Sequence, residues 1–455
     1  MAIGFRSPDA SANFPIRAIG PLRAAGGERA SILIQFVIAF GLIFISSAFT
    51  LQLASDSNGE LGSDSSGGLY GSVVLQIITV LTGAFGFFLI VTSRNALSLA
   101  IRCWPILAMV ALAFASATWS WNYPYTIQKS YVLLNVVLFA VAMVGRLSPT
   151  ECIRLILRVM VLECLLSIFW VIIFPDSALQ QKTGIGYPLD TIDRWRGIFS
   201  HKQGLGVFAG LTTGLLTFYG SIAFRSPIIR IAAIFIALAC VIGSDSATGL
   251  VLIIVTPIIL YSTYWIAIHL APTGRYLALN VMLLAIVFLY VCWSYGLLDF
   301  LPRLIGKTSD LSGRAEFSFL AMEIFRNSGT TLLGGGYAVG LQRSFPRDLY
   351  IDNGYVDLLM QFGYLGSALI IVFVGWVLFA GKRLIVRTSR ELAVLDVFPM
   401  AITLVFAFVN ITEGYFLAKN ISMVFAALAV AMIVQARQPV PAEQPGLRIR
   451  VSKHH

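Results

Sequence analysis

Residues 194–223 read RWRGIFSHKQGLGVFAGLTTGLLTFYGSIA, a charged segment joined directly to a run of apolar residues. The part from 203 to 223 contains no Asp, Glu, Lys or Arg. A helix of roughly 20 apolar residues crosses the ~30 Å hydrocarbon core of a bilayer, so this run is long enough to span a membrane. The stretch therefore predicts a membrane-spanning helix whose entrance carries two arginines, a lysine and a histidine.

The apolar character of this stretch extends over the whole chain. Of 455 residues, 58% are hydrophobic and only 12% are charged, and the mean hydropathy is +0.83. One soluble core could not bury so many apolar residues, which excludes a soluble globular protein. We expect an all-α, polytopic membrane protein with about 12 transmembrane helices and a long outer loop between spans 9 and 10. The predicted spans are residues 31–53, 69–92, 103–121, 127–145, 156–174, 203–223, 228–244, 248–268, 276–298, 358–380, 396–411 and 420–436.

Basic residues decide the expected orientation, because short loops rich in Lys and Arg stay on the cytoplasmic side. Most of the 32 Lys and Arg residues fall in segments that would share one side with both termini, whereas the outer loop 54–68 has none. We therefore expect both termini to be cytoplasmic. The expected order is an N-terminal tail at 1–30, spans 1–9 within 31–298 with an outer loop at 175–202, a long outer loop at 299–357, spans 10–12 within 358–436 and a C-terminal tail at 437–455.

The two long outer loops hold most of the basic residues that are expected outside. Either this is solvated loop charge balanced by nearby acids, or some of it forms an anion site. The planar arginine fork grips phosphate at two points, so Arg194, Arg196, Lys202 and Arg314 would suit a pyrophosphate. Because Arg196 and Lys202 flank the entrance to the span at 203–223, the implied ligand has an anionic head and a lipid tail. The basic residues of these loops are Lys182, Arg194, Arg196, Lys202, Arg303, Lys307, Arg314, Arg326, Arg343 and Arg347.

Ionisable residues inside the predicted spans are few, which argues against a proton-coupled or ion-coupled carrier. Glu163 is the clear case, and its nearness to Arg158 predicts that its side chain reaches the membrane interface. The glycines at 334–336 lack the Lys and Ser or Thr of a Walker loop, so ATP-driven work is not expected. The cysteines and histidines have no paired spacing, and we expect neither a metal site nor a cofactor.

The longest outer loop contains two further patterns. Residues 313–328, GRAEFSFLAMEIFRNS, place apolar residues at helical spacing, which predicts a helix that lies at the membrane interface or in the core of a small outer domain. Residues 332–341, LLGGGYAVGL, supply glycines that favour either a turn or a phosphate cradle.

These segments resemble one protein family. The run RGIFSHKQGLG at 196–206 is similar to the Gly-Ile-Phe-x-His-Lys-Asn-x-x-Gly motif of the bacterial O-antigen ligase and Wzy-type polymerase superfamily, especially its ExoQ-like exopolysaccharide polymerase branch. The resemblance continues in family order over roughly half of the chain. The further segments are GSDSATGLV at 243–251, SGR at 312–314, LLGGGY at 332–337, DNGYVDLLMQFGYLG at 352–366 and NITEGYFLAKN at 410–420.

The resemblance implies a metal-independent glycosyltransferase without a cofactor, working at the periplasmic face of the bacterial inner membrane. Its donor would be an oligosaccharide on undecaprenyl pyrophosphate, held by Arg194, Arg196, Lys202 and Arg314. Membrane lipid and other polysaccharide export components are the other expected partners, and no nucleic acid is expected. The acceptor hydroxyl would attack the anomeric carbon with the help of a general base.

The general base is the point at which this chain departs from the family pattern. The family places a histidine where this chain has Asp352, and an aspartate of ordinary pKa ~3.9 is a weaker base unless burial raises that pKa. Asp352 is the first candidate, Glu413 and His201 are alternatives, and a route without a strong base stays open. Asp352 could instead cap the following helix, and His201 could be a structural residue at the entrance of its span.

Four functions remain open on the sequence, of which a non-catalytic assembly partner of a polysaccharide machine is the least favoured. A polymerase that joins lipid-linked repeat units is favoured over a ligase that moves glycan to lipid A-core or protein, because the family histidine is absent. A transporter or flippase of lipid-linked sugars is the alternative from another class.

Overall fold

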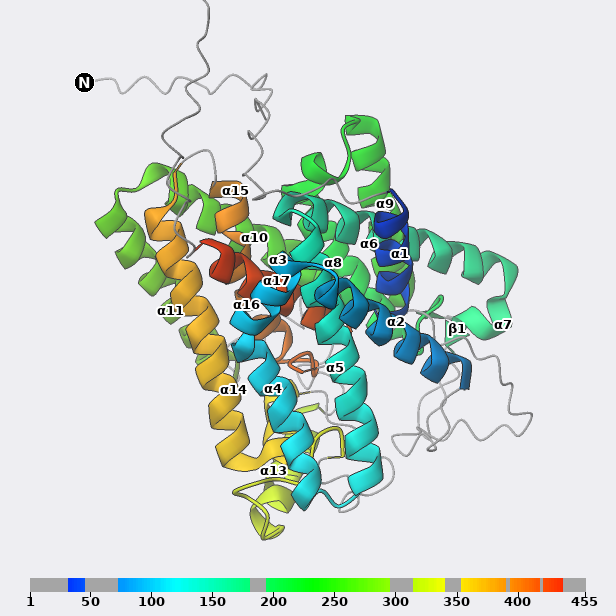
Figure 1. The fold of residues 1–455 in the computed structure, drawn as a ribbon, viewed down its shortest axis with the longest axis vertical. Helices are drawn as coiled ribbons and strands as arrows, with labels where there is room; N and C mark the ends of the chain where they lie inside the picture. Colours follow the sequence, from blue (N-terminus) through cyan, green and yellow to red (C-terminus); the bar gives the residue numbers. More distant parts are fainter. Residues whose placement is uncertain are drawn as a thin grey trace, which may run out of the picture.

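The computed structural model describes residues 32–45, 73–180, 194–294, 314–339, 353–389, 393–417 and 420–436, which form a bundle of helices with one short strand pair (Figure 1). The predicted class, an all-α multi-pass membrane protein, is confirmed. In the described part, 6 helices are long and apolar enough to cross a membrane, or up to 7 if a bent pair forms one span. Shorter apolar helices accompany them, so the total of about 12 crossings stays a prediction.

The described helices coincide with all of the predicted spans, although several of their boundaries differ. They are α1 (Ile32–Ile45), α2 (Val73–Val91), α3 (Arg94–Arg102), α4 (Trp104–Ala115), the 3₁₀ helix η1 (Ser116–Trp119), α5 (Tyr123–Arg146), α6 (Pro149–Ile173), α7 (Pro175–Ala178), α8 (Lys202–Ala223), α9 (Pro227–Ser244), α10 (Ala247–His269), α11 (Pro272–Ser294), α13 (Arg314–Asn327), α14 (Gly354–Arg387), α15 (Ala393–Asp396), α16 (Phe398–Val409) and α17 (Ile421–Ala436). Strands β1 (Leu179–Gln180) and β2 (Arg194–Trp195) pair antiparallel, with Leu179 opposite Trp195.

Helix α8 lies at the centre of the bundle and packs against α6, α9 and α10. Its glycines let α10 approach closely: a Cβ on Gly210 would overlap the carbonyl of Gly249, and one on Gly214 would lie 2.6 Å from Cβ of Thr256. Small residues at such crossings are a common means of helix association in membranes. Residues 203–223, which the sequence predicted as a membrane span, therefore belong to a buried central helix.

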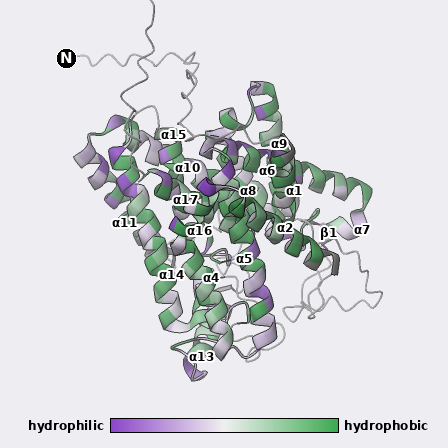
Figure 2. Ribbon diagram, viewed as in Figure 1, coloured by the Kyte–Doolittle hydropathy of each residue, from purple (hydrophilic) through white to green (hydrophobic). Residues whose placement is uncertain are grey.

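The perimeter of the bundle exposes large apolar side chains. On α9, Ile228 is 77% exposed, Phe235 63% and Ile242 65%. Figure 2 shows hydrophobic residues along α2, α6 and α9, and hydrophilic residues on α13. Exposed apolar surface of this extent is what a lipid-facing helix carries, and it supports the membrane assignment.

Helix α6 begins earlier than predicted, because Ser148 and Glu151 form a capping box. The Ser148 hydroxyl accepts from the Glu151 backbone N–H, and the Glu151 carboxylate accepts from the Ser148 backbone N–H. Pro149 occupies the first turn, where backbone N–H groups have no partner within the helix. The N–H that proline lacks therefore costs no hydrogen bond.

The side chain of Glu163 does not reach the interface, which corrects the sequence expectation. It is 0% exposed and lies on the inner face of α6 with Met160, Cys164 and Ser167. Arg158, its expected companion, instead donates from Nε to the carbonyl of Ala223, 3.0 Å away. The sequence predicted where Glu163 lies along α6. It did not predict that neighbouring helices cover the face of α6 that carries Glu163.

Residues 94–102, expected as a loop, form helix α3. Its axis lies at 107° to residues 77–91 of α2. Ser93 caps it by accepting from the N–H of Ala96, and Ala96 and Leu99 are buried while Arg94 and Arg102 are exposed. This one-sided burial is typical of a helix that lies along a membrane surface.

Arginines gather at one end of the bundle, which we call the basic end and define by Arg146, Arg154, Arg158, Arg225 and Arg275. Several of them donate to carbonyls at the C-termini of neighbouring helices, which have no partner within their own helix. Arg146 reaches Leu89 on α2, Arg154 and Arg158 reach the end of α8, and Arg275 reaches the end of α14. We call the opposite end, where α8, α10 and α14 begin, the loop end.

Candidate functional site

The segment before α8 is held in place by the short strand pair at the loop end. The backbone N–H groups of Arg196 and Gly197 both donate to the carbonyl of Ala178, at 2.9 and 3.1 Å. Gly197 has φ +55°, and a Cβ there would overlap Ser167 on α6. A glycine is required at this position, and it fixes the chain directly after Arg196.

Arg194 forms an ion pair with Asp245, with 2.9 Å between Nη2 and Oδ2. Asp245 ends α9 in the left-handed conformation, at φ 49°. Trp195 fits against Gly243, where a Cβ would overlap its indole ring. Arg194 is therefore placed at the loop end, and its charge already has an acidic partner.

The guanidinium of Arg196 is half-buried and directed by its backbone surroundings. Its Nε donates to the carbonyl of Ser177 at 2.9 Å, and Ser177 accepts from the indole N–H of Trp170. Burial lowers the pKa of Arg196 below its usual range, but the group remains a cation at neutral pH. A cation fixed in a partly dry site interacts strongly with an anion.

His201 and Lys202 lie at the N-terminus of α8. His201 is the N-cap, because its Nδ1 accepts from the backbone N–H of Gln203 at 3.2 Å. The backbone N–H of Lys202 donates to Oε1 of Gln180 on β1 at 3.0 Å. The structural role allowed for His201 is thus present, and the helix N-terminus adds positive potential beside Lys202.

Asp352 lies outside the described residues, but its neighbour Asn353 settles which residue caps α14. Oδ1 of Asn353 accepts from the N–H groups of Tyr355 and Val356, at 3.0 and 3.3 Å. The capping role that the sequence allowed for Asp352 is therefore filled by the next residue. Helix α14 also starts before the predicted span at 358.

Glu413 belongs to a loop that packs on the start of α14. The N–H of Gly354 donates to the carbonyl of Asn410 at 2.9 Å. Oδ1 of Asn410 accepts from the N–H groups of Tyr415 and Phe416, which folds the loop around it. Segments 353–357 and 410–416, which hold or adjoin two of the predicted bases, are in direct contact.

Asp357 is a carboxylate of this site that the sequence analysis missed. A Cβ on Gly414 would lie 3.3 Å from its Oδ2, so the carboxylate faces the loop that carries Glu413. Oδ2 also accepts from Nε2 of Gln361 at 2.7 Å, one turn along α14. The sequence signal that could have identified Asp357 is its position one turn after the N-cap, within the segment DNGYVDLLM.

A hydroxyl contact connects the start of α10 to the loop that carries Glu413. Thr248, in the first turn of α10, donates from Oγ1 to Oγ1 of Thr412 at 3.4 Å. Ser246 caps α10 and closes over Gly206 of α8, where a Cβ would overlap the serine. The loop end thus brings together 194–206, 243–251, 353–366 and 410–417, segments far apart in the sequence.

Residues 332–337, the glycine-rich segment after α13, pack on α14, and we call them the glycine plug. The N–H groups of Gly335 and Gly336 donate to the carbonyls of Met360 and Gln361, at 2.8 and 2.9 Å. These carbonyls lie just before a break in α14 at Gly363, whose φ is 60°. Because those two N–H groups are committed, the turn interpretation of this segment is favoured over the phosphate cradle.

Tyr337 connects the glycine plug to the loop that carries Glu413. Its hydroxyl donates to the carbonyl of Leu417 at 2.7 Å, and its own carbonyl accepts from Oγ1 of Thr126. Burial, with the charge of Asp357 nearby, raises the pKa of the Tyr337 phenol, which stays neutral. Residues 337, 357 and 417 are therefore parts of one packed unit.

The predicted helix at 313–328 is confirmed as α13. Ala321 and Phe325 are fully buried and pack against Val356 and Met360 of α14. Arg314 is the first residue of α13; the position of its side chain lies outside the described features, so its predicted role stays a prediction.

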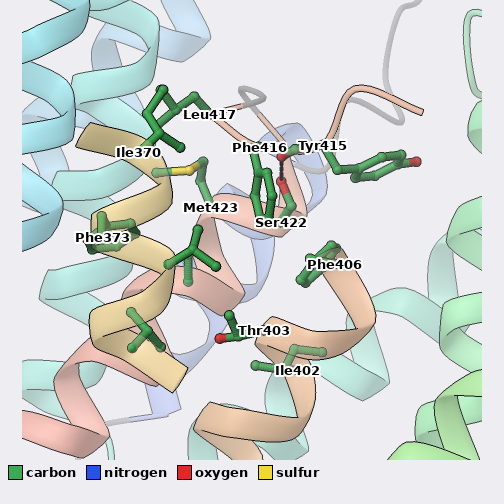
Figure 3. A pocket seen from close by; sticks show the side chains of 13 residues that line it. Ile370, Phe373, Ile402, Thr403, Phe406, Tyr415, Phe416, Leu417, Ser422 and Met423 are labelled. Atoms are coloured by element: carbon green, nitrogen blue, oxygen red, sulfur yellow. Dashed lines mark hydrogen bonds between the residues drawn. The ribbon is translucent and has the colours of Figure 1, made fainter. Parts of the chain in front are cut away.

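An apolar groove adjoins the loop that carries Glu413. It lies between α14, α16 and α17 and has a cavity volume of about 50 Å³ (Figure 3). Phe373 and Phe406 line its walls, and Tyr415 and Phe416 form its rim, where the hydroxyl of Ser422 donates to the Tyr415 carbonyl at 2.8 Å.

No protein-family model and no curated protein sequence matches this chain. Among the residues that the structure describes, no group of three His, Cys, Asp or Glu side chains is arranged to hold a metal ion.

Proposed function

We propose that this protein transfers glycan from undecaprenyl-pyrophosphate-linked repeat units, and that the loop end is its periplasmic active face. One observation carries the proposal: the cationic segment 194–202 and the acidic loop around Glu413 converge at one end of the bundle, joined through Asp245–Thr248 and Thr412. Such a donor has an anionic head, a sugar and an apolar tail, and the loop end offers cations for the head and an apolar groove for the tail.

The pyrophosphate would be held by Arg196, Arg194, Lys202 and Arg314. Arg196 is the principal residue in this scheme, because its guanidinium is half-buried and oriented by the Ser177 carbonyl. As the bond from the anomeric carbon to the pyrophosphate oxygen breaks, negative charge grows on the leaving group. Fixed cations stabilise that charge more strongly where water is excluded.

The acceptor hydroxyl would attack the anomeric carbon and lose its proton to a carboxylate. Asp352 remains the first candidate, since Asn353 already caps α14 and leaves Asp352 without that duty. Glu413 is the alternative, because its loop packs on the same turn of α14. His201 is the least favoured of the three, since its Nδ1 is engaged as the N-cap of α8.

The isoprenoid tail would lie in the groove between α14, α16 and α17. The groove is lined almost entirely by apolar side chains, and its lining residues Tyr415 and Phe416 lie two and three residues after Glu413. This differs from the path along α8 that the sequence suggested, because most of α8 is buried by other helices.

A transporter of lipid-linked sugars is the second candidate, and one observation favours it. Glu163 is fully buried near the middle of α6, where an ionisable side chain is a functional candidate by default. A ligase that transfers glycan to lipid A-core or protein shares the chemistry of the polymerase and differs in its acceptor.

Purified protein in lipid vesicles, given undecaprenyl-pyrophosphate-linked oligosaccharide, separates these functions. Products that lengthen in steps would support the polymerase, and a single transfer to an added acceptor would support the ligase. Movement of unaltered donor between leaflets would support the transporter and contradict the proposal. Activity that persists in excess EDTA would support the metal-independent chemistry.

A further inference from the structure

A cluster of three arginines at the basic end has no role in the proposed function. Arg154 and Arg158 lie in the first turns of α6, and Arg225 lies in the turn between α8 and α9. Arg154 and Arg225 are both close enough for their charges to act on the guanidinium of Arg158. Like charges held together in this way destabilise one another unless an anion lies between them.

The cluster uses little of its hydrogen-bonding capacity. Arg154 donates from Nε to the carbonyl of Ile222, and Arg158 donates from Nε to the carbonyl of Ala223, each at 3.0 Å. These bonds hold both side chains beside the end of α8, and the Arg158 guanidinium also lies 6.0 Å from the Phe224 ring centre. Within the described part of the chain, the terminal amino groups of both arginines have no carboxylate partner.

A small cavity of about 50 Å³ lies beside this cluster and opens to the surface. Arg154 and Arg158 line it together with Gln35 of α1 and Glu151. One oxygen of the Glu151 carboxylate, Oε2, is engaged at the helix start, where it accepts from both the N–H and the hydroxyl of Ser148. The local balance is therefore positive, and the donors are arginine forks suited to phosphate oxygens.

An exposed apolar stripe leads away from the cavity along α6. Its members follow Arg158 at helical spacing on the outward face of the helix: Leu162, Leu165, Phe169 and Ile172. A ligand with a phosphate head and hydrocarbon chains would thus find its head beside the arginines and its chains along one helix.

From this arrangement we infer that Arg154, Arg158 and Arg225 bind the phosphate headgroup of an anionic membrane phospholipid. Basic pockets between helices at a membrane surface bind such headgroups, with about 1 kcal/mol of attraction per basic residue. The inference is independent of the proposed glycan transfer, because it concerns the opposite end of the bundle. It commits to a lipid rather than to a free phosphate, because the apolar stripe adjoins the cavity.

The test measures binding of phosphatidylglycerol to the detergent-purified full-length protein by native mass spectrometry, with phosphatidylcholine as the neutral comparison. Arg225→Gln is the main variant, because Arg225 makes no hydrogen bond to the described residues and its loss leaves the end of α8 capped. Arg158→Gln is the second variant. Arg94→Gln is the matched control, since Arg94 is another exposed arginine, on α3, outside the cluster.

We expect phosphatidylglycerol to bind more tightly than phosphatidylcholine, and each cluster variant to weaken it about fivefold. Arg94→Gln should leave binding unchanged, and soluble glycerol 3-phosphate should not displace the lipid at millimolar concentration. Equal binding of both lipids, equal weakening by all three variants, or displacement by glycerol 3-phosphate would each overturn the inference.

Discussion

The ion pair between Arg194 and Asp245, 2.9 Å long, joins the segment before α8 to the turn between α9 and α10. Both side chains are partly exposed, at 21% and 45%, so the pair contributes only ~0–1 kcal/mol to stability. The pair instead fixes the position of Arg194, in the same segment as Arg196 and Lys202. Asp245 would also compete with an anion for the Arg194 guanidinium.

The first prediction concerns this pair. Asp245→Asn should change the melting temperature by no more than a few degrees, and should tighten binding of a lipid-pyrophosphate donor because Arg194 loses its competing carboxylate. Arg194→Gln should weaken donor binding. The apparent KM for the donor, measured beside thermal unfolding, checks both; a weaker donor affinity in Asp245→Asn would show that Arg194 does not bind the donor.

The second prediction separates chemistry from capping at the start of α14. Asn353→Ala removes the N-cap and should lower the free energy of unfolding by about 1 kcal/mol, while Asn353→Asp should preserve it. Asp352→Asn should leave stability unchanged and remove most transfer activity, because an amide cannot accept the acceptor's proton.

A histidine at position 352 gives this prediction a second arm. Asp352→His should retain transfer activity that declines as pH falls below about 6.5, where the imidazole becomes protonated and can no longer act as a base. A fully active Asp352→Asn protein with an unchanged pH profile would transfer the role to Glu413.

The third prediction tests the glycine plug. Gly336 has φ +100°, and a Cβ there would overlap Ser120, whereas Gly329 has φ +71° with nothing within 4 Å. Gly329→Ala should therefore lose only the ~1 kcal/mol of left-handed strain. Gly336→Ala should lose a further ~2 kcal/mol from overpacking, seen as a lower melting temperature. Equal melting temperatures for the two variants would mean that the plug is not packed as described.

The fourth prediction concerns sidedness. Single cysteines at Asn327, in the last turn of α13, and at Arg387, at the end of α14, should react from opposite sides of the membrane. We expect Asn327→Cys to react with an impermeant thiol reagent added to intact cells, and Arg387→Cys to react only after lysis. The opposite pattern would place the loop end in the cytoplasm and remove the proposed access to periplasmic substrate.

The helical class and helix α13 could be predicted from sequence, because apolar length and helical periodicity are local signals. Residues 320–325 alternate between burial and exposure at the spacing of a helix that packs on one side. The break at Gly363 could not be predicted, because it depends on carbonyls that bond to Gly335 and Gly336 from a distant segment. Nothing within residues 354–387 distinguishes a kinked glycine from an ordinary one.

The candidate site was predicted only in part, because some of its residues carry local sequence signals and others depend on contacts with distant segments. Residues 194–202 carry a visible charge pattern, and the structure places them at the loop end with the Glu413 segment. Asp357 was missed, because its significance comes from Gly414 and Gln361, which meet it only after folding. Glu163 was misplaced because its burial is decided by the helices that pack against α6.

Under the proposed function, cations at the loop end hold a lipid pyrophosphate during glycan transfer. The most direct measurement is the initial rate of glycan transfer from undecaprenyl-pyrophosphate-linked oligosaccharide by the purified protein. Arg196→Ala is compared with Arg326→Ala, an exposed arginine of α13, as the matched control. The account predicts that Arg196→Ala lowers the rate at least about 100-fold, as loss of a charge-stabilising group does, while Arg326→Ala remains near the unaltered protein. Equal rates in both variants, or no transfer by the unaltered protein, would contradict it.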